Sequence, residues 1–294
     1  MIGEQDPHGD IRVIKKVREP VRLGKDAFSA GLISDKSRQK TVQAFRKFAG
    51  LLKEHRVSYA RAVATSALRE AANSELVIRE VRDAAFINIE IIDGIEEGRL
   101  IFSAVTHRLD LHERISLLID IGGGSVELTV ADHGKPLGTQ TFKLGTVRLL
   151  QLMEERKLKE KQLIPLIEER LGPVKAFLRE TLKGMHIDHA IGTGGNFECL
   201  GKLRVALLQK NSIFSMTHHE LKQLLKHLES MSIRERIQFL RLRPDRADVL
   251  VPAALVTDAI MNVAEVDLLT IPYVGLRDGI LSDLSQKVSL RAVR

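Results

Sequence analysis

The sequence predicts an α/β protein with two domains, and three observations support this. Segments with the alternation of strands are interspersed with segments of helical periodicity along the chain. The chain has 294 residues, which suits two domains at about 150 residues each. Two glycine-rich turns, at 122–124 and 192–195, each follow an apolar strand pattern.

Composition narrows the class of protein. The chain is 44% hydrophobic and 28% charged, as in globular proteins with a substantial core. Aromatic residues are few, and the net charge of +7 comes from Lys and Arg along the whole chain. A solvated basic surface is therefore as good an interpretation as a polyanion site, and nucleic-acid binding is not favoured. No segment reaches the ~20 apolar residues of a membrane span. The single cysteine, Cys199, excludes an internal disulfide and indicates a cytoplasmic location.

The first part of the chain alternates strands and helices. The elements that we expect here are a strand and loop at 11–24, a helix from Ser34-Asp35 to Leu52, a strand at 59–65, a helix at 74–85 and a strand at 88–92. This order is typical of an α/β sheet.

Two sets of residues in this part are candidates for a functional site. Arg69 follows a run of small residues at a strand end, where it would bind an anion or simply pair on the surface. Glu96 and Glu97 open a helix, where acids favour the helix dipole; alternatively, one of them is a general base for water. The segment 108–114 is rich in charged residues and interrupts the regular spacing of apolar residues. We therefore place the domain boundary there, which gives domains 1–112 and 113–294.

The central motif is a glycine hairpin. An apolar run ends in Asp120, then come Gly122, Gly123, Gly124 and Ser125, and a second apolar run follows with Glu127. We expect the glycines to adopt positive φ and to direct backbone N–H groups toward phosphate oxygens. Asp120 and Glu127 would hold a divalent cation from opposite strands. An ordinary glycine-rich turn is the alternative.

The second part of the chain contains another strand that is followed by a glycine turn and a helix. We first expect a strand at 136–143, a helix from Gly145, amphipathic segments within 158–183, and a strand that leads into the turn at Gly192, Thr193 and Gly194. We then expect a helix capped by Thr217 and Glu220, a buried helix through Met261, a strand at 268–273 and a final helix. The turn at 192–194 is a second candidate phosphate or nucleotide loop. His186, His189, His218 and His219 are interpreted as solvated rather than as metal ligands.

Eight segments in the right order resemble the exopolyphosphatase / guanosine pentaphosphate phosphatase family. They are Pro20–Gly24, Ala62–Arg69, Glu96–Ile101, Asp120–Glu127, Leu144–Leu149, Gly192–Gly195, Asp245–Asp248 and Gly275–Gly279. The resemblance implies two ribonuclease H-like domains of the actin, heat-shock chaperone and sugar kinase superfamily, with the active site between them. It also implies hydrolysis of terminal phosphate from inorganic polyphosphate or guanosine pentaphosphate with a divalent metal, usually Mg²⁺.

The resemblance assigns roles residue by residue. Glu97 matches the catalytic base that activates water, Asp120 and Glu127 match the metal-associated acids, and Arg69 matches an arginine of the anion cleft. Gly122 to Ser125 match a phosphate loop. A homodimer is one oligomeric state that the family implies.

One departure from the family pattern leaves alternatives open. The family opens with a strand and a first phosphate loop of the type Asp-Ile-Gly-Ser, and no such motif precedes residue 20. The expectation is that the start is placed too late; the alternative is a chain without half of its phosphate clamp. A binding or regulatory protein with impaired catalysis is therefore the second hypothesis. An ATP-using kinase or ATPase is the third, and a nucleic-acid-binding protein is the weakest.

Overall fold

The computed structural model describes residues 1–6 and 11–292, and the chain divides into two compact units. Unit 1 comprises Met1–Ser103 with Leu276–Arg294, and unit 2 comprises Ala104–Gly275. The last segment thus groups with the first part of the chain, whereas the sequence analysis assigned it to a domain 113–294. Each unit is described by itself.

Unit 2 is built on a six-stranded mixed sheet in the order β7-β6-β5-β8-β10-β9. Its strands are β5 (Ile115–Ile121), β6 (Val126–Asp132), β7 (Lys135–Phe142), β8 (His189–Thr193), β9 (Ser215–Thr217) and β10 (Leu268–Thr270). The three strands β5 to β7 form an antiparallel meander, whereas β8 runs parallel to both β5 and β10. The hairpin and the strand at 136–143 that the sequence predicted are confirmed.

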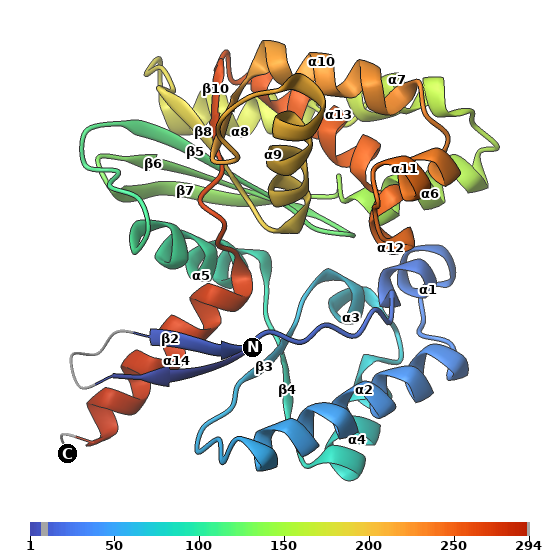
Figure 1. Ribbon diagram of the computed structural model, residues 1–294, viewed down its shortest axis with the longest axis vertical. Helices are drawn as coiled ribbons and strands as arrows, with labels where there is room; N and C mark the ends of the chain where they lie inside the picture. The colour runs from blue at the N-terminus through green and yellow to red at the C-terminus, as the bar shows by residue number, and fades with distance from the viewer. Residues whose placement is uncertain (7–10, 293–294) are drawn as a thin grey trace. The chain divides into compact units, whose positions relative to one another are not determined.

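Helices complete unit 2 (Figure 1). They are α6 (Thr146–Glu155), the short η1 (Glu160–Gln162), α7 (Leu163–Glu168), α8 (Gly172–Leu182), α9 (Gly195–Leu208), α10 (His218–Glu229), α11 (Ile233–Phe239), α12 (Pro244–Ala247) and α13 (Leu250–Val263). The predicted capping box is present, because the Thr217 side chain accepts from the Glu220 N–H and the Glu220 carboxylate accepts from the Thr217 N–H. The nearly uncharged α13 is buried over most of its length.

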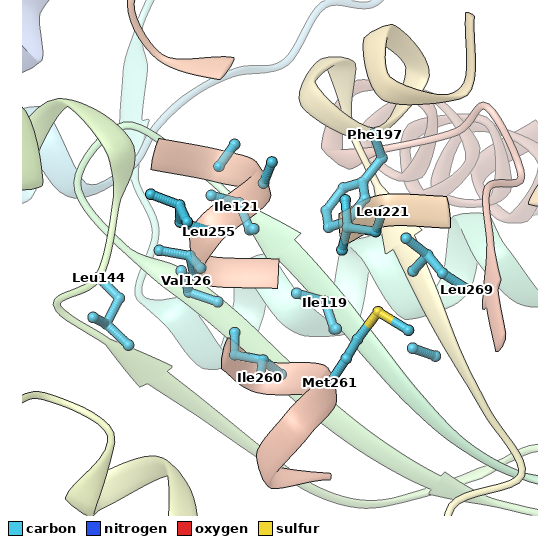
Figure 2. Packing of buried hydrophobic residues seen from close by; sticks show 14 of the residues in the cluster. Ile119, Ile121, Val126, Leu144, Phe197, Leu221, Leu255, Ile260, Met261 and Leu269 are labelled. Atoms are coloured by element: carbon cyan, nitrogen blue, oxygen red, sulfur yellow. The ribbon is translucent and has the colours of Figure 1, made fainter. Parts of the chain in front are cut away.

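Strand alternation separates the core of unit 2 from its chemistry. Ile119 and Ile121 of β5 and Val126 of β6 pack with residues of α13, such as Leu255 and Ile260 (Figure 2). Because successive side chains of a strand point to opposite faces, Asp120 and Glu127 lie on the other face. The buried core therefore fixes the register that places these two acids together.

Unit 1 has a different sheet arrangement. Strands β1 (Ile2–Gln5) and β2 (Ile11–Lys15) form one antiparallel pair, and β3 (Ala62–Ala64) and β4 (Ile89–Ile91) form a separate parallel pair. The helices are α1 (Leu23–Ala30), α2 (Asp35–Glu54), α3 (Ser66–Glu70), α4 (Ser74–Ala85), α5 (Gly94–Thr106), which continues into unit 2, and α14 (Leu276–Ala292). Ser34 caps α2 by accepting from the Ser37 N–H, and α4 has the predicted bounds.

Ion pairs hold α14 within unit 1. Asp283 of α14 contacts Arg61 at 3.0 Å, Arg99 at 2.8 Å and Lys287 at 2.8 Å. Arg61 and Arg99 also pair with Glu96. These contacts link residues far apart in the sequence, which explains why local patterns assigned the last helix to the other domain.

Two of the four histidines differ from the solvated interpretation. His218 is half-buried and lies 2.6 Å from the Asp258 carboxylate. His189 is buried in β8, and burial lowers the pKa of its ring. Both histidines therefore contribute to the packing of unit 2.

In the part of the chain that the structure describes, no helix is long and apolar enough to cross a membrane.

Candidate functional site

The glycine hairpin of unit 2 is shaped by the helix that follows β7. The carbonyl of Gly122 accepts from the N–H of Thr146, and the carbonyl of Gly123 accepts from the N–H groups of Val147 and Arg148. The Gly124 carbonyl accepts from Arg148 Nε at 2.7 Å. Three successive loop carbonyls are therefore directed at the first turn of α6.

This arrangement directs the loop N–H groups to the opposite side. In a trans peptide the C=O of one residue and the N–H of the next point in opposite directions, and the chain has no cis peptide among the described residues. The N–H groups of Gly123, Gly124 and Ser125 consequently point away from α6. Converging N–H groups of this kind form a binding site for anion oxygens.

The expected reason for the glycines is wrong. Gly122, Gly123 and Gly124 are not among the glycines with positive φ. A glycine is instead required at residue 145, where the start of α6 closely approaches the hairpin loop. The sequence analysis identified Gly145 only as the start of a helix. A Cβ atom on Gly145 would lie 2.2 Å from the Gly124 carbonyl carbon and 2.3 Å from the Ser125 nitrogen. The helix can reach the loop because residue 145 has no side chain.

Asp120 and Glu127 are direct cross-strand partners at the mouth of the hairpin. Directly opposed residues of an antiparallel pair have Cβ atoms about 5 Å apart on the same face. Asp120 accepts a hydrogen bond of 2.6 Å from the Thr193 hydroxyl, and Glu127 is buried. Carboxylate oxygens are hard ligands, and two neighbouring carboxylates are suited to bind a divalent cation such as Mg²⁺.

Burial has a strong effect on Asp120. It raises the pKa of the carboxyl group to about 6, and the hydrogen bond from Thr193 partly opposes this shift. A folded-state pKa above the ordinary 3.8 means that the native state binds more protons than the unfolded chain between these values. Asp120 therefore destabilises the metal-free protein as pH rises from about 4 to about 6.

The Asp120→Asn variant should be more stable than the wild type without metal at about pH 8, by at most ~3 kcal/mol. The amide keeps an oxygen for Thr193 and removes the buried charge. Thermal melts should show the difference disappearing toward pH 4, and Mg²⁺ should raise the melting temperature of the wild type alone. Glu155→Gln, at an exposed position of α6, is the matched control and should have the stability and the Mg²⁺ response of the wild type. Equal responses of wild type and Asp120→Asn to Mg²⁺ would exclude Asp120 as a ligand.

The second glycine turn meets the first at Asp120. Thr193 ends β8, and Gly194 follows with φ +84°; a Cβ there would lie 3.2 Å from Asp120 Oδ1. Asn196, in the first turn of α9, donates to the Ile121 carbonyl at 3.0 Å. Gly192 serves packing, because a Cβ there would overlap the Phe197 ring. The structure thus brings Thr193 and Gly194 beside Asp120, one of the two acids of the candidate metal site.

Arg246 is a residue of this region that the site prediction omitted. It extends from α12 to the start of α9, where it donates to Asn196 Oδ1 and lies 2.7 Å from the position of a Cβ on Gly195. Burial lowers the pKa of its guanidinium. The signal in the sequence was the segment Asp245–Asp248, which was noted without a role.

In unit 1, Arg69 and Glu97 lie together. Arg69 Nη1 donates to the Ile92 carbonyl at 2.6 Å and is 3.8 Å from Glu97 Oε2. The neighbouring Glu96 is held differently: Arg99, and then Arg61, lower the pKa of its carboxyl group. Glu96 is thus held by two arginines, whereas Glu97 is buried and lies beside Arg69.

Fold and hairpin geometry together define an α/β protein with a backbone anion site. The model of the Ppx/GppA phosphatase family matches residues 1–288, so the chain belongs to this family. It is 25% identical over 287 residues to guanosine-5'-triphosphate,3'-diphosphate pyrophosphatase of Vibrio vulnificus, covering 97% of this chain and 57% of that protein. It is also 25% identical over 272 residues to exopolyphosphatase 1 of Mycobacterium leprae, covering 91% and 80%.

Solved structures show the same fold. An exopolyphosphatase from Cytophaga hutchinsonii superposes with a TM-score of 0.86 at 24% identity, covering 97% of this chain and 93% of that one. The Aquifex aeolicus member of the Ppx/GppA family gives a TM-score of 0.73 at 23% identity, with 97% and 92% covered. The chain spans little more than half the length of the Vibrio relative.

Proposed function

We propose that this chain is a divalent-metal-dependent phosphohydrolase that releases terminal phosphate from inorganic polyphosphate or guanosine pentaphosphate. The observation that carries the proposal is the hairpin, in which three N–H groups point one way beside the Asp120–Glu127 pair. The names of the relatives support the reaction class.

In this proposal the phosphate oxygens accept from the N–H groups of Gly123, Gly124 and Ser125 and from the Ser125 hydroxyl. Arg69 and Arg246 neutralise further negative charge, and Glu97 removes the proton from the attacking water. A cation bound by Asp120 and Glu127 supplies additional charge neutralisation. Phosphoryl transfer depends mainly on positioning and on such electrostatic stabilisation.

A second candidate function is binding of the same substrates without turnover. The separate strand pairs β1–β2 and β3–β4 favour it, because a divided sheet holds α3 with Arg69 and α5 with Glu97 less rigidly than one continuous sheet. This chain would then sense polyphosphate or guanosine polyphosphates.

The test is phosphate release from polyphosphate and from guanosine pentaphosphate, with Mg²⁺ and with a chelator. Release that requires Mg²⁺ supports the hydrolase. Calorimetric binding without release supports the second candidate, and ADP formation from ATP would instead indicate a kinase or ATPase. If the chain neither binds these substrates nor releases phosphate from them, both proposed functions are excluded.

A further inference from the structure

Positive charge is concentrated in residues 11–69. Residues 11–69 contain 15 Lys and Arg against 4 Asp and Glu, a net charge of +11, whereas the whole chain has +7. The rest of the chain is therefore net negative. The other 30 of the 45 Lys and Arg lie elsewhere, so the basic residues are spread along the chain as expected but are densest in residues 11–69.

Much of this charge lies on one exposed face of α2. The exposed positions after the first residue of the helix are Lys36, Gln39, Lys40, Gln43, Arg46, Lys47, Gly50, Lys53 and Glu54. They recur at steps of three and four residues, so they form one stripe on the helix. Asp35 and Glu54 are the only acids of α2 and lie at its two ends. At 1.5 Å per residue the cationic stripe is about 25 Å long.

The stripe differs from an ordinary solvated helix surface. The neighbouring α4 mixes both signs, with Glu75, Arg79, Glu80, Arg82 and Asp83 in close succession. On α2, within the part of the chain that the structure describes, Lys36, Lys40, Arg46 and Lys53 make no side-chain ion pair, whereas Lys47 contacts Glu19. Four of the five exposed cations of α2 thus have no ion-pair partner among the described residues, and Arg46 lines a pocket that Glu80 and Asp83 of α4 also line.

The chemistry of the stripe indicates its ligand. Its exposed side chains are ammonium, guanidinium and amide groups, with no exposed aromatic or aliphatic side chain between Lys36 and Lys53. Bases of single-stranded nucleic acid would need aromatic platforms, and membrane insertion would need exposed apolar side chains. A flexible chain with closely spaced charges needs only a row of cations.

We propose that the exposed face of α2 is a second binding surface for long-chain inorganic polyphosphate, separate from the phosphate-releasing site. The surface holds segments of the chain away from the end that is hydrolysed. This inference rests on the proposed function and adds a dependence on substrate length. A long chain can occupy both sites at once, whereas a substrate of a few phosphates can occupy only one.

The test compares two variants of equal charge change. One carries Lys36→Gln, Lys40→Gln, Arg46→Gln and Lys53→Gln, which breaks no ion pair of the described residues. The control carries Lys135→Gln, Lys161→Gln, Lys175→Gln and Lys226→Gln, all at exposed positions of unit 2. The α2 variant should raise KM for long-chain polyphosphate about tenfold, and leave KM for tripolyphosphate unchanged. The control variant should change neither value.

The other outcomes overturn the inference. An unchanged KM for long chains shows that the stripe is only a solvated face, and equal increases for long and short substrates show a general effect of charge. If the wild type releases no phosphate, the proposed function fails, and anisotropy with labelled polyphosphate still tests the surface by the same comparison of variants. Competition by duplex DNA at equal affinity would assign the surface to nucleic acid instead.

Discussion

Replacing Glu97 by glutamine is expected to lower kcat for phosphate release about 10³-fold, with little change in KM. Glutamine has the shape of glutamate but cannot accept a proton from water. The amide has the size of the carboxylate and can occupy the same position, although it loses the ion pair with Arg69 at 3.8 Å. Steady-state kinetics with polyphosphate and Mg²⁺ measure the effect.

Glu96→Gln is the matched control, since it changes the adjacent acid of the same helical turn. It weakens the ion pairs of Glu96 with Arg61 and Arg99. The free energy of unfolding should fall by about 1 kcal/mol, while kcat stays within a few-fold of the wild type. If instead Glu96→Gln loses activity and Glu97→Gln keeps it, the roles of the two acids must be exchanged.

Gly145→Ala is expected to lose phosphate release almost completely and to lower the melting temperature. The new Cβ would lie 2.2 Å from the Gly124 carbonyl carbon, so helix α6 and the hairpin must separate. The contacts from α6 to the carbonyls of Gly122, Gly123 and Gly124 then break, and the loop N–H groups lose their common direction. Thermal melts and phosphate-release assays measure both effects.

Gly50→Ala serves as the control for Gly145→Ala. A Cβ on Gly50 meets no atom within 4 Å, and alanine is the better residue inside a helix by about 0.5–1 kcal/mol. This variant should be slightly more stable and should release phosphate from tripolyphosphate like the wild type. A Gly145→Ala protein with a normal melting temperature and normal phosphate release would show that the close approach of helix and loop has no functional role.

Local chemistry made much of the fold predictable. The helix start at Ser34-Asp35, the Thr217–Glu220 capping box and the hairpin between two apolar runs depend on residues close together in the sequence, and the structure confirms them. The pairing of Asp120 with Glu127 also follows, because strand alternation and a buried core fix the register.

Contacts between distant segments could not be predicted in the same way. Arg246 reaches Asn196 from a helix 50 residues later, and Asp283 meets Arg61 from the other end of the chain. A charged residue in a sequence does not indicate which distant partner it finds. The requirement at Gly145 was missed for a related reason, because it arises from the packing of α6 on a loop more than 20 residues earlier.

The divided sheet of unit 1 has a consequence for heat inactivation. Unit 1 has a small buried cluster around Ile33, Leu68 and Val77, whereas unit 2 has one large core. Less buried apolar surface means a lower free energy of local opening, and unit 1 carries Glu97 and Arg69. Catalytic capacity should therefore be lost at a lower temperature than the main calorimetric transition. Coincident loss of activity and of heat-absorbing structure would show that the two units unfold as one.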